Sequence, residues 1–99
     1  MAQLTADERL AKVKTALGMN GSDYQDDTLR LYIGEVVEFM IDAGVQKAVA
    51  ESEAAVGCIA IGVNDLWNYS SGGVRFSDYF KSRIVQLSLK RVETNVQTN

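Results

Sequence analysis

The chain has 99 residues, of which 46% are hydrophobic and 23% are charged, and its formal net charge at pH 7 is −3. This length allows a single domain, residues 1–99, built on one hydrophobic core. Ten basic residues against thirteen acidic ones leave no basic footprint of the kind that a free-standing nucleic-acid binder carries. The single cysteine excludes an intramolecular disulfide.

Two features of the whole chain favour an all-α fold. Proline is absent, and β-branched residues do not alternate with polar ones over any long run. The start of the chain, MAQLTADERL, lacks the basic residues and the long apolar run of a signal peptide, so we expect a protein that acts in the cell that makes it. The predicted architecture is a small bundle of about four helices, with a central buried helix and a mobile Gly/Ser loop before the last helix.

The first predicted helix starts with a capping box, because Thr5 is followed three residues later by Glu8. Leucine and valine then recur at helical spacing up to Gly18, which suits the left-handed position past a helix end. A turn-rich linker follows. The sequence therefore predicts a short amphipathic helix.

The second predicted helix opens at Asp26 and Asp27, whose carboxylates are expected to cap free N–H groups and to face the positive end of the helix dipole. It is the clearest amphipathic helix of the chain, and Gly44 is expected to end it. Tyr32 and Phe39 lie on a flank of its apolar stripe, and either the edge of the core or a second contact surface explains them. Its apolar stripe consists of Leu29, Ile33, Val36, Val37, Met40 and Ile41.

The central helix is expected to run from Glu53 to about Tyr69, with Ser52 as its cap. It has no solvent face until Asn64 and Asp65, so other helices must surround it. Its apolar run is too short to span a bilayer. For the segment before it, 45–51, a helical turn and a loop both fit. Gly57 and Gly62 either mark the close approach of another backbone or are simply tolerated.

The last helix is expected to restart at Ser77 with Asp78 after an exposed, mobile loop at 70–75. It carries two apolar stripes, which suggest two neighbours: one stripe serves the core, and the other either contacts another subunit or widens the core-facing side. The first stripe consists of Phe80, Ile84 and Leu87, and the second of Val85, Leu89 and Val92. The tail, residues 91–99, is polar and without periodicity, so we expect it to be disordered in the isolated protein.

The sequence offers little for catalysis. There is no histidine, which is the usual general base at neutral pH and the commonest metal ligand. Cys58 lies in an apolar run that disfavours its thiolate, so it is interpreted as a core residue. Asp23, Asp26 and Asp27 lack the glycine of a calcium loop, and helix capping explains them better. We therefore predict no catalytic, cofactor-binding or metal-binding residues and no enzymatic activity.

Three segments together resemble the small head–tail connector proteins of tailed bacteriophages. They are the start of the second helix, the central helix ending in Asn-Asp-Leu-Trp-Asn-Tyr, and the start of the last helix. The resemblance covers about residues 5 to 90, and its pattern is one of helix caps and core residues. The segment 45–51 departs from the family, because it lacks the expected proline-containing link. The matching residues are Asp26-Asp27-Thr28-Leu29-Arg30-Leu31-Tyr32-Ile33, Ala54 to Tyr69, and Phe76-Ser77-Asp78-Tyr79-Phe80.

This resemblance implies a structural role at the head–tail interface of the virion, after assembly in the bacterial host cytoplasm. Copies are expected to form a ring, of about twelve subunits in such connectors, beneath the portal protein. The ring extends the DNA channel and offers a platform to a tail or stopper protein. DNA is expected to pass without sequence-specific binding, and no membrane is involved.

Two other functions stay open. One is a small helical adaptor or regulator that binds a single protein partner. The other is a helix-turn-helix DNA binder, for which the turn at Gly44 is the only support.

Three groups of contact residues are predicted for the connector. The second stripe of the last helix is the candidate for subunit packing. The Gly/Ser loop is the candidate for touching the tail side or lining the channel, and the polar tail is the candidate for docking on the portal. The groups are Val85, Leu89 and Val92; Tyr69, Ser71, Gly72, Gly73, Val74, Arg75 and Phe76; and Glu93, Thr94, Asn95, Val96 and Gln97 within the tail up to Asn99.

Overall fold

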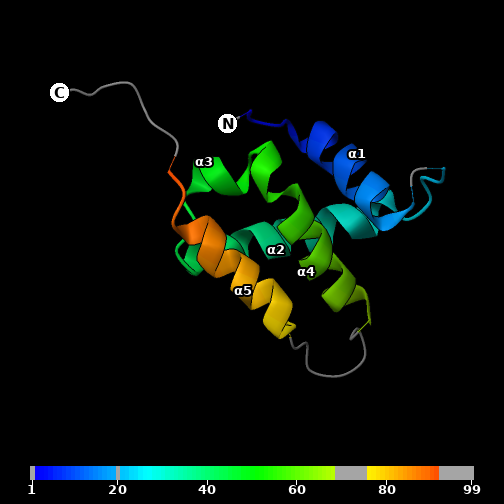
Figure 1. The fold of residues 1–99 in the computed structure, drawn as a ribbon. Coiled ribbons are helices and arrows are strands. Elements are labelled where there is room, and N and C mark those ends of the chain that lie inside the picture. The colour runs from blue at the N-terminus through cyan, green and yellow to red at the C-terminus, as the bar shows by residue number, and fades with distance from the viewer. Residues whose placement is uncertain (1, 20, 69–75, 92–99) are drawn as a thin grey trace.

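The computed structural model describes residues 2–19, 21–68 and 76–91. Over these residues the chain is a compact all-helical globule of five helices without strands (Figure 1). This confirms the all-α prediction, and the count is close to the four-helix bundle expected. The helices are α1 (Ala6–Leu17), α2 (Asp26–Asp42), α3 (Lys47–Ala50), α4 (Val56–Asn68) and α5 (Asp78–Ser88).

Helix α1 begins and ends through local hydrogen bonds that the sequence predicts. The Thr5 hydroxyl accepts from the Glu8 backbone N–H at 3.1 Å, and the Glu8 carboxylate accepts from the Thr5 backbone N–H at 2.8 Å. Gly18 follows the helix with φ 72°, a conformation that a residue with a Cβ rarely adopts. Both predicted ends of the first helix are therefore confirmed.

The start of α2 differs from the prediction. Gln25 is its N-cap residue, and no side chain caps the helix. Asp26 instead forms an ion pair with Lys14 of α1, with 2.8 Å between Lys14 Nζ and Asp26 Oδ1. Asp26 and Asp27 still lie in the first turn, where the helix dipole favours them, but the capping role is wrong. Past the end of the helix, Gly44 has φ 109° and ends it as expected.

The segment 45–51 forms the single turn of helix α3, followed by a 3₁₀ turn at Glu53–Ala55. Ser52 caps that turn, because its hydroxyl accepts from the Ala54 backbone N–H at 3.2 Å. The N-terminal residues lie alongside: the backbone N–H of Leu4 donates to Glu51 and that of Glu53 donates to Ala2. The central helix proper therefore begins three residues later than predicted.

Helix α4 is the core of the fold and packs against α1, α2 and α5 (Figure 1). Most of its residues are buried, as the sequence predicts, but its exposed positions differ from expectation. Gly57 is exposed, whereas Asp65, expected on the solvent face, is buried because its carboxylate accepts hydrogen bonds from Ser77. The buried residues of α4 are Cys58, Ile59, Ala60, Gly62, Val63, Asp65 and Leu66.

Gly62 lies where α4 meets α2 and α5. A Cβ built on it would lie 2.7 Å from Phe80 Cε1 and 2.9 Å from Val36 Cγ1, closer than carbon atoms pack. Nothing lies within 4 Å of the same position on Gly57. Of the two alternatives, Gly57 is therefore simply tolerated, whereas Gly62 does mark a close approach, made by side chains rather than by a backbone.

Candidate functional site

The described residues offer few groups for chemistry. No group of three or more His, Cys, Asp or Glu side chains in residues 2–19, 21–68 and 76–91 is placed to hold a metal ion. Cys58 is fully buried, and this burial raises the pKa of its thiol to about 11, although the charge of nearby Arg83 lowers it in part. Within the same residues, no helix has the length and apolar character needed to cross a membrane.

The two apolar stripes of α5 face opposite ways. Phe80, Ile84 and Leu87 are buried in the core, as predicted. Val85 and Leu89 lie on the outer side and are 61% and 78% exposed, so a widened core-facing stripe does not account for them. Val92, the third member of the predicted packing group, lies outside the described residues. Exposed aliphatic side chains at adjacent turns of one helix are a candidate contact surface.

The other two predicted contact groups fall almost wholly outside the described residues. The residues outside the described ranges include Tyr69, the loop residues from Ser71 to Arg75 and the tail from Glu93 to Asn99. Phe76 is described, and it is half-buried against Phe39 and Phe80, with ring centroids 4.7 Å and 4.6 Å away. Phe76 therefore has a packing role within the subunit.

Helix α2 exposes a surface that the sequence analysis missed. Its side away from the core holds Leu31, which is 61% exposed, among four exposed carboxylates. We call Asp27, Leu31, Glu35, Glu38 and Asp42 the acidic face. Their spacing of three and four residues places them on one side of a helix and was available in the sequence.

Helix α5 has the opposite charge. Residues 76–91 contain one acidic residue, Asp78, and four basic residues, Lys81, Arg83, Lys90 and Arg91. Lys81 and Val85 in α5, its C-cap residue Leu89 and Lys90 directly after it are all exposed. We call Lys81, Val85, Leu89 and Lys90 the basic face.

Neither face has its charges neutralised by the described part of the chain. The ion pairs found there are Lys12–Glu53, Lys14–Asp26, Arg30–Asp7 and Lys47–Glu51. None of them involves a residue of the acidic face or of the basic face. Both faces are therefore open to a charged partner.

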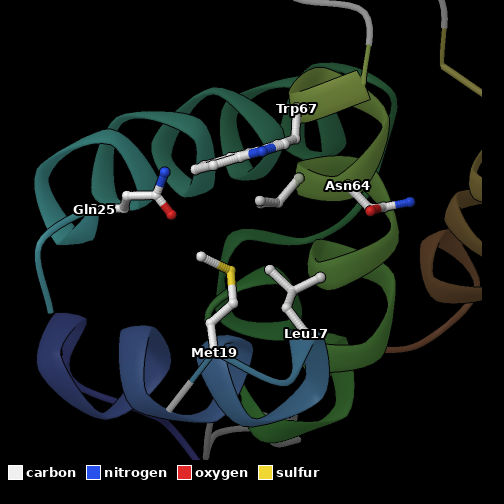
Figure 2. Close-up of a pocket in the computed structure, with 6 residues that line it drawn as sticks. Leu17, Met19, Gln25, Asn64 and Trp67 are labelled. Carbon is white, nitrogen blue, oxygen red and sulfur yellow. The ribbon is translucent and has the colours of Figure 1, made fainter. Parts of the chain in front are cut away.

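A pocket of about 280 Å³ lies between the end of α1, the start of α2 and α4 (Figure 2). Figure 2 shows the Trp67 ring along one side and the Met19 side chain opposite it, with the Gln25 amide pointing inward and Asn64 pointing away. Tyr32 packs edge-on against Trp67 at 5.8 Å between centroids and holds the indole in place. We call this cavity the Trp67 pocket. It is lined by Leu17, Met19, Gln25, Val63, Asn64 and Trp67.

Comparison of the chain with protein-family models, with curated proteins and with solved structures finds no match.

Proposed function

We propose that this protein is a structural subunit of the connector between the head and the tail of a tailed bacteriophage. Copies of it form a ring beneath the portal protein, extend the DNA channel and give a tail or stopper protein its platform. The subunit acts by binding copies of itself and its neighbours, and it catalyses no reaction. It is assembled in the host cytoplasm and remains at the head–tail interface of the virion.

The observation that carries this proposal is the outer side of α5. Val85 and Leu89 are large apolar side chains that the fold leaves in water, although the same helix buries three others completely or nearly so. Full burial of such a side chain is worth about 1.5–3 kcal/mol, and covering Val85 and Leu89 recovers the part that belongs to their exposed surface, which gives association a driving force. A subunit that packs against copies of itself needs such a surface.

The net charge fits the passage of DNA. A ring of about twelve copies would have a formal charge of about −36, because each chain has −3. A negatively charged channel repels the phosphate backbone and lets DNA slide without being held.

The size of the purified protein tests the proposal. We expect association into large, ring-shaped particles as concentration rises or when portal protein is added, measured by sedimentation and seen in electron micrographs. Leu89→Asp should abolish these particles without loss of helicity, because Leu89 is 78% exposed. Ala11→Glu, at an exposed position of α1, also adds a negative charge but leaves the apolar side chains of α5 in place and should assemble normally.

Two results would overturn the proposal. One is a protein that stays a monomer or dimer at every concentration, also with portal protein present. The other is a phage that matures and infects normally after the gene for this protein is deleted.

The portal contact has its own test. Deleting Glu93 to Asn99 should weaken binding to the portal protein and leave the thermal midpoint unchanged. Unchanged portal binding would remove the tail from the contact.

A second function, an adaptor for a single protein partner, is favoured by the Trp67 pocket. Its apolar wall and the inward amide of Gln25 suit one apolar side chain of a partner together with its backbone amide. An adaptor of this kind would form a complex of one copy each and would lose it on Trp67→Ala. A connector would keep its ring when only this pocket is changed.

A further inference from the structure

We infer that subunits associate head to tail, with the basic face of α5 in one copy seated on the acidic face of α2 in the next. This inference rests on the proposed function, because it names the surfaces through which copies of the chain meet. It adds what the resemblance does not supply: the two helices involved and the sign of the charge on each.

The two faces have opposite charges. The acidic face has four carboxylates and no basic residue, and α2 contains only one basic side chain, Arg30, whose guanidinium is paired with Asp7 at 2.8 Å. The basic face has two lysines, and Arg83 and Arg91 lie nearby in sequence. Opposite charges across a contact fix its register and exclude wrong pairings.

The two faces also match in their apolar side chains. Each face places exposed aliphatic side chains among its charges: Leu31 on α2, and Val85 and Leu89 on α5. Exposed ion pairs contribute only about 0–1 kcal/mol each, so burial of these three side chains supplies most of the driving force. The charges decide which face meets which.

The charges also bear on the symmetry of the contact. A twofold contact centred on either face would place α5 against α5 or α2 against α2, and like charges would then face one another. A twofold contact that joined α5 to α2 in both directions would close at the dimer and form no ring. Only α5 on α2 joins opposite charges. Because the two faces are different surfaces of the subunit, such a contact repeats from copy to copy and closes into a ring when the rotation allows it.

The two faces are free to act in this way because they point away from the interior. Phe39 of α2 stacks on Phe80 of α5 at 5.9 Å between centroids, so the two helices meet through other sides. Leu31 and Leu89 remain mostly exposed after that packing. Each subunit thus offers both surfaces at once.

Charge reversal tests the contact. Glu35→Lys, Glu38→Lys and Asp42→Lys together make the acidic face basic, and Lys81→Glu with Lys90→Glu makes the basic face acidic. Each of the two variants alone should weaken self-association by at least about tenfold, because like charges then meet. An equimolar mixture of the two variants should assemble again, since each acidic surface then finds a basic one on the other variant. All five residues are exposed, so circular dichroism should show unchanged helicity.

A cross-link gives a second measurement. Leu31→Cys combined with Leu89→Cys should form disulfide-linked chains of copies under oxidation. Leu89→Cys alone should form none, and Cys58 should not interfere because it is fully buried. A cross-linked dimer from Leu89→Cys alone would instead show a twofold contact between α5 helices and would overturn the inference.

The outcomes separate the inference from the proposed function. Rings that form normally in both charge-reversed variants would overturn the α5–α2 contact and leave the connector role standing. A wild-type chain that never associates, with or without portal protein, would overturn both. Failure of the mixture to assemble where the wild type does would also overturn the contact.

Discussion

One carboxylate oxygen of Asp65 accepts two hydrogen bonds from Ser77, at 3.0 Å from the backbone nitrogen and at 2.9 Å from the hydroxyl oxygen. The Ser77 hydroxyl in turn accepts from the Phe80 backbone N–H at 3.2 Å and caps α5. Asp65 lies on α4, so the end of the central helix is tied to the start of the last one. This bond network sets where α5 begins and which of its sides meets the core.

Removing the carboxylate should loosen that tie. Asp65→Ala leaves the Ser77 N–H and hydroxyl without their acceptor in a site where Asp65 is only 8% exposed. We expect a loss of about 1–3 kcal/mol in the free energy of unfolding, measured by urea denaturation. Asp78→Ala, at an exposed carboxylate in the first turn of α5, removes only a favourable interaction with the helix dipole and should change it by less than about 1 kcal/mol. Equal effects of the two substitutions would show that the buried tie has no special role.

Substitution by alanine should change stability in opposite directions at the two glycines of α4. Gly62→Ala places a methyl group 2.7 Å from Phe80 Cε1, and such overpacking costs typically about 1–3 kcal/mol. Gly57→Ala meets open space and gains helix propensity, so it should stabilise by up to about 1 kcal/mol. Thermal unfolding of both variants measures the difference. A stabilised Gly62→Ala would mean that Phe80 and Val36 move aside at little cost.

The sequence predicts most reliably those features that depend on contacts within one helical turn. The capping box at Thr5 and Glu8, the left-handed Gly18 and the Ser77 cap all follow from hydrogen bonds between near neighbours, and the structure has each of them. The buried stripe of α5 also follows, because helical spacing alone places its members on one side.

The predictions are wrong where a residue far away in the sequence determines the local contacts. Asp26 was expected to cap its own helix, but Lys14 from α1 lies beside it and pairs with it. Asp65 was expected in water, because nothing local shows that Ser77, twelve residues later, will bond to it. The Trp67 pocket depends on three segments that come together only in the fold, so no single stretch of sequence predicts it. The acidic face, in contrast, was visible as spacing in the sequence and was missed.

The buried thiol predicts how stability depends on pH. Burial raises the pKa of Cys58 from 9.0 to about 11, so between these values the unfolded chain has lost the proton that the folded chain keeps. The free energy of unfolding therefore falls as pH rises, by up to about 1.4 kcal/mol per pH unit. Below pH 9 the contribution of Cys58 to stability is fully present. Urea denaturation at pH 8 and pH 10 measures the slope, and Cys58→Ala should lose this part of it. The same slope in both proteins would assign the effect to other groups.

Phe76 gives a test of where a predicted contact residue acts. The sequence groups it with the loop residues that are predicted to touch the tail side or line the channel, whereas the structure packs its ring against Phe39 and Phe80. Phe76→Ala should therefore lower the free energy of unfolding by about 1–3 kcal/mol, less than a fully buried phenylalanine because the ring is half-exposed. Tyr79→Ala, at a residue that is 64% exposed in the first turn of α5, should leave stability nearly unchanged. Urea denaturation of the two isolated variants measures their free energies of unfolding. A Phe76→Ala chain that is as stable as the wild type but fails to assemble would show that Phe76 belongs to the contact surface.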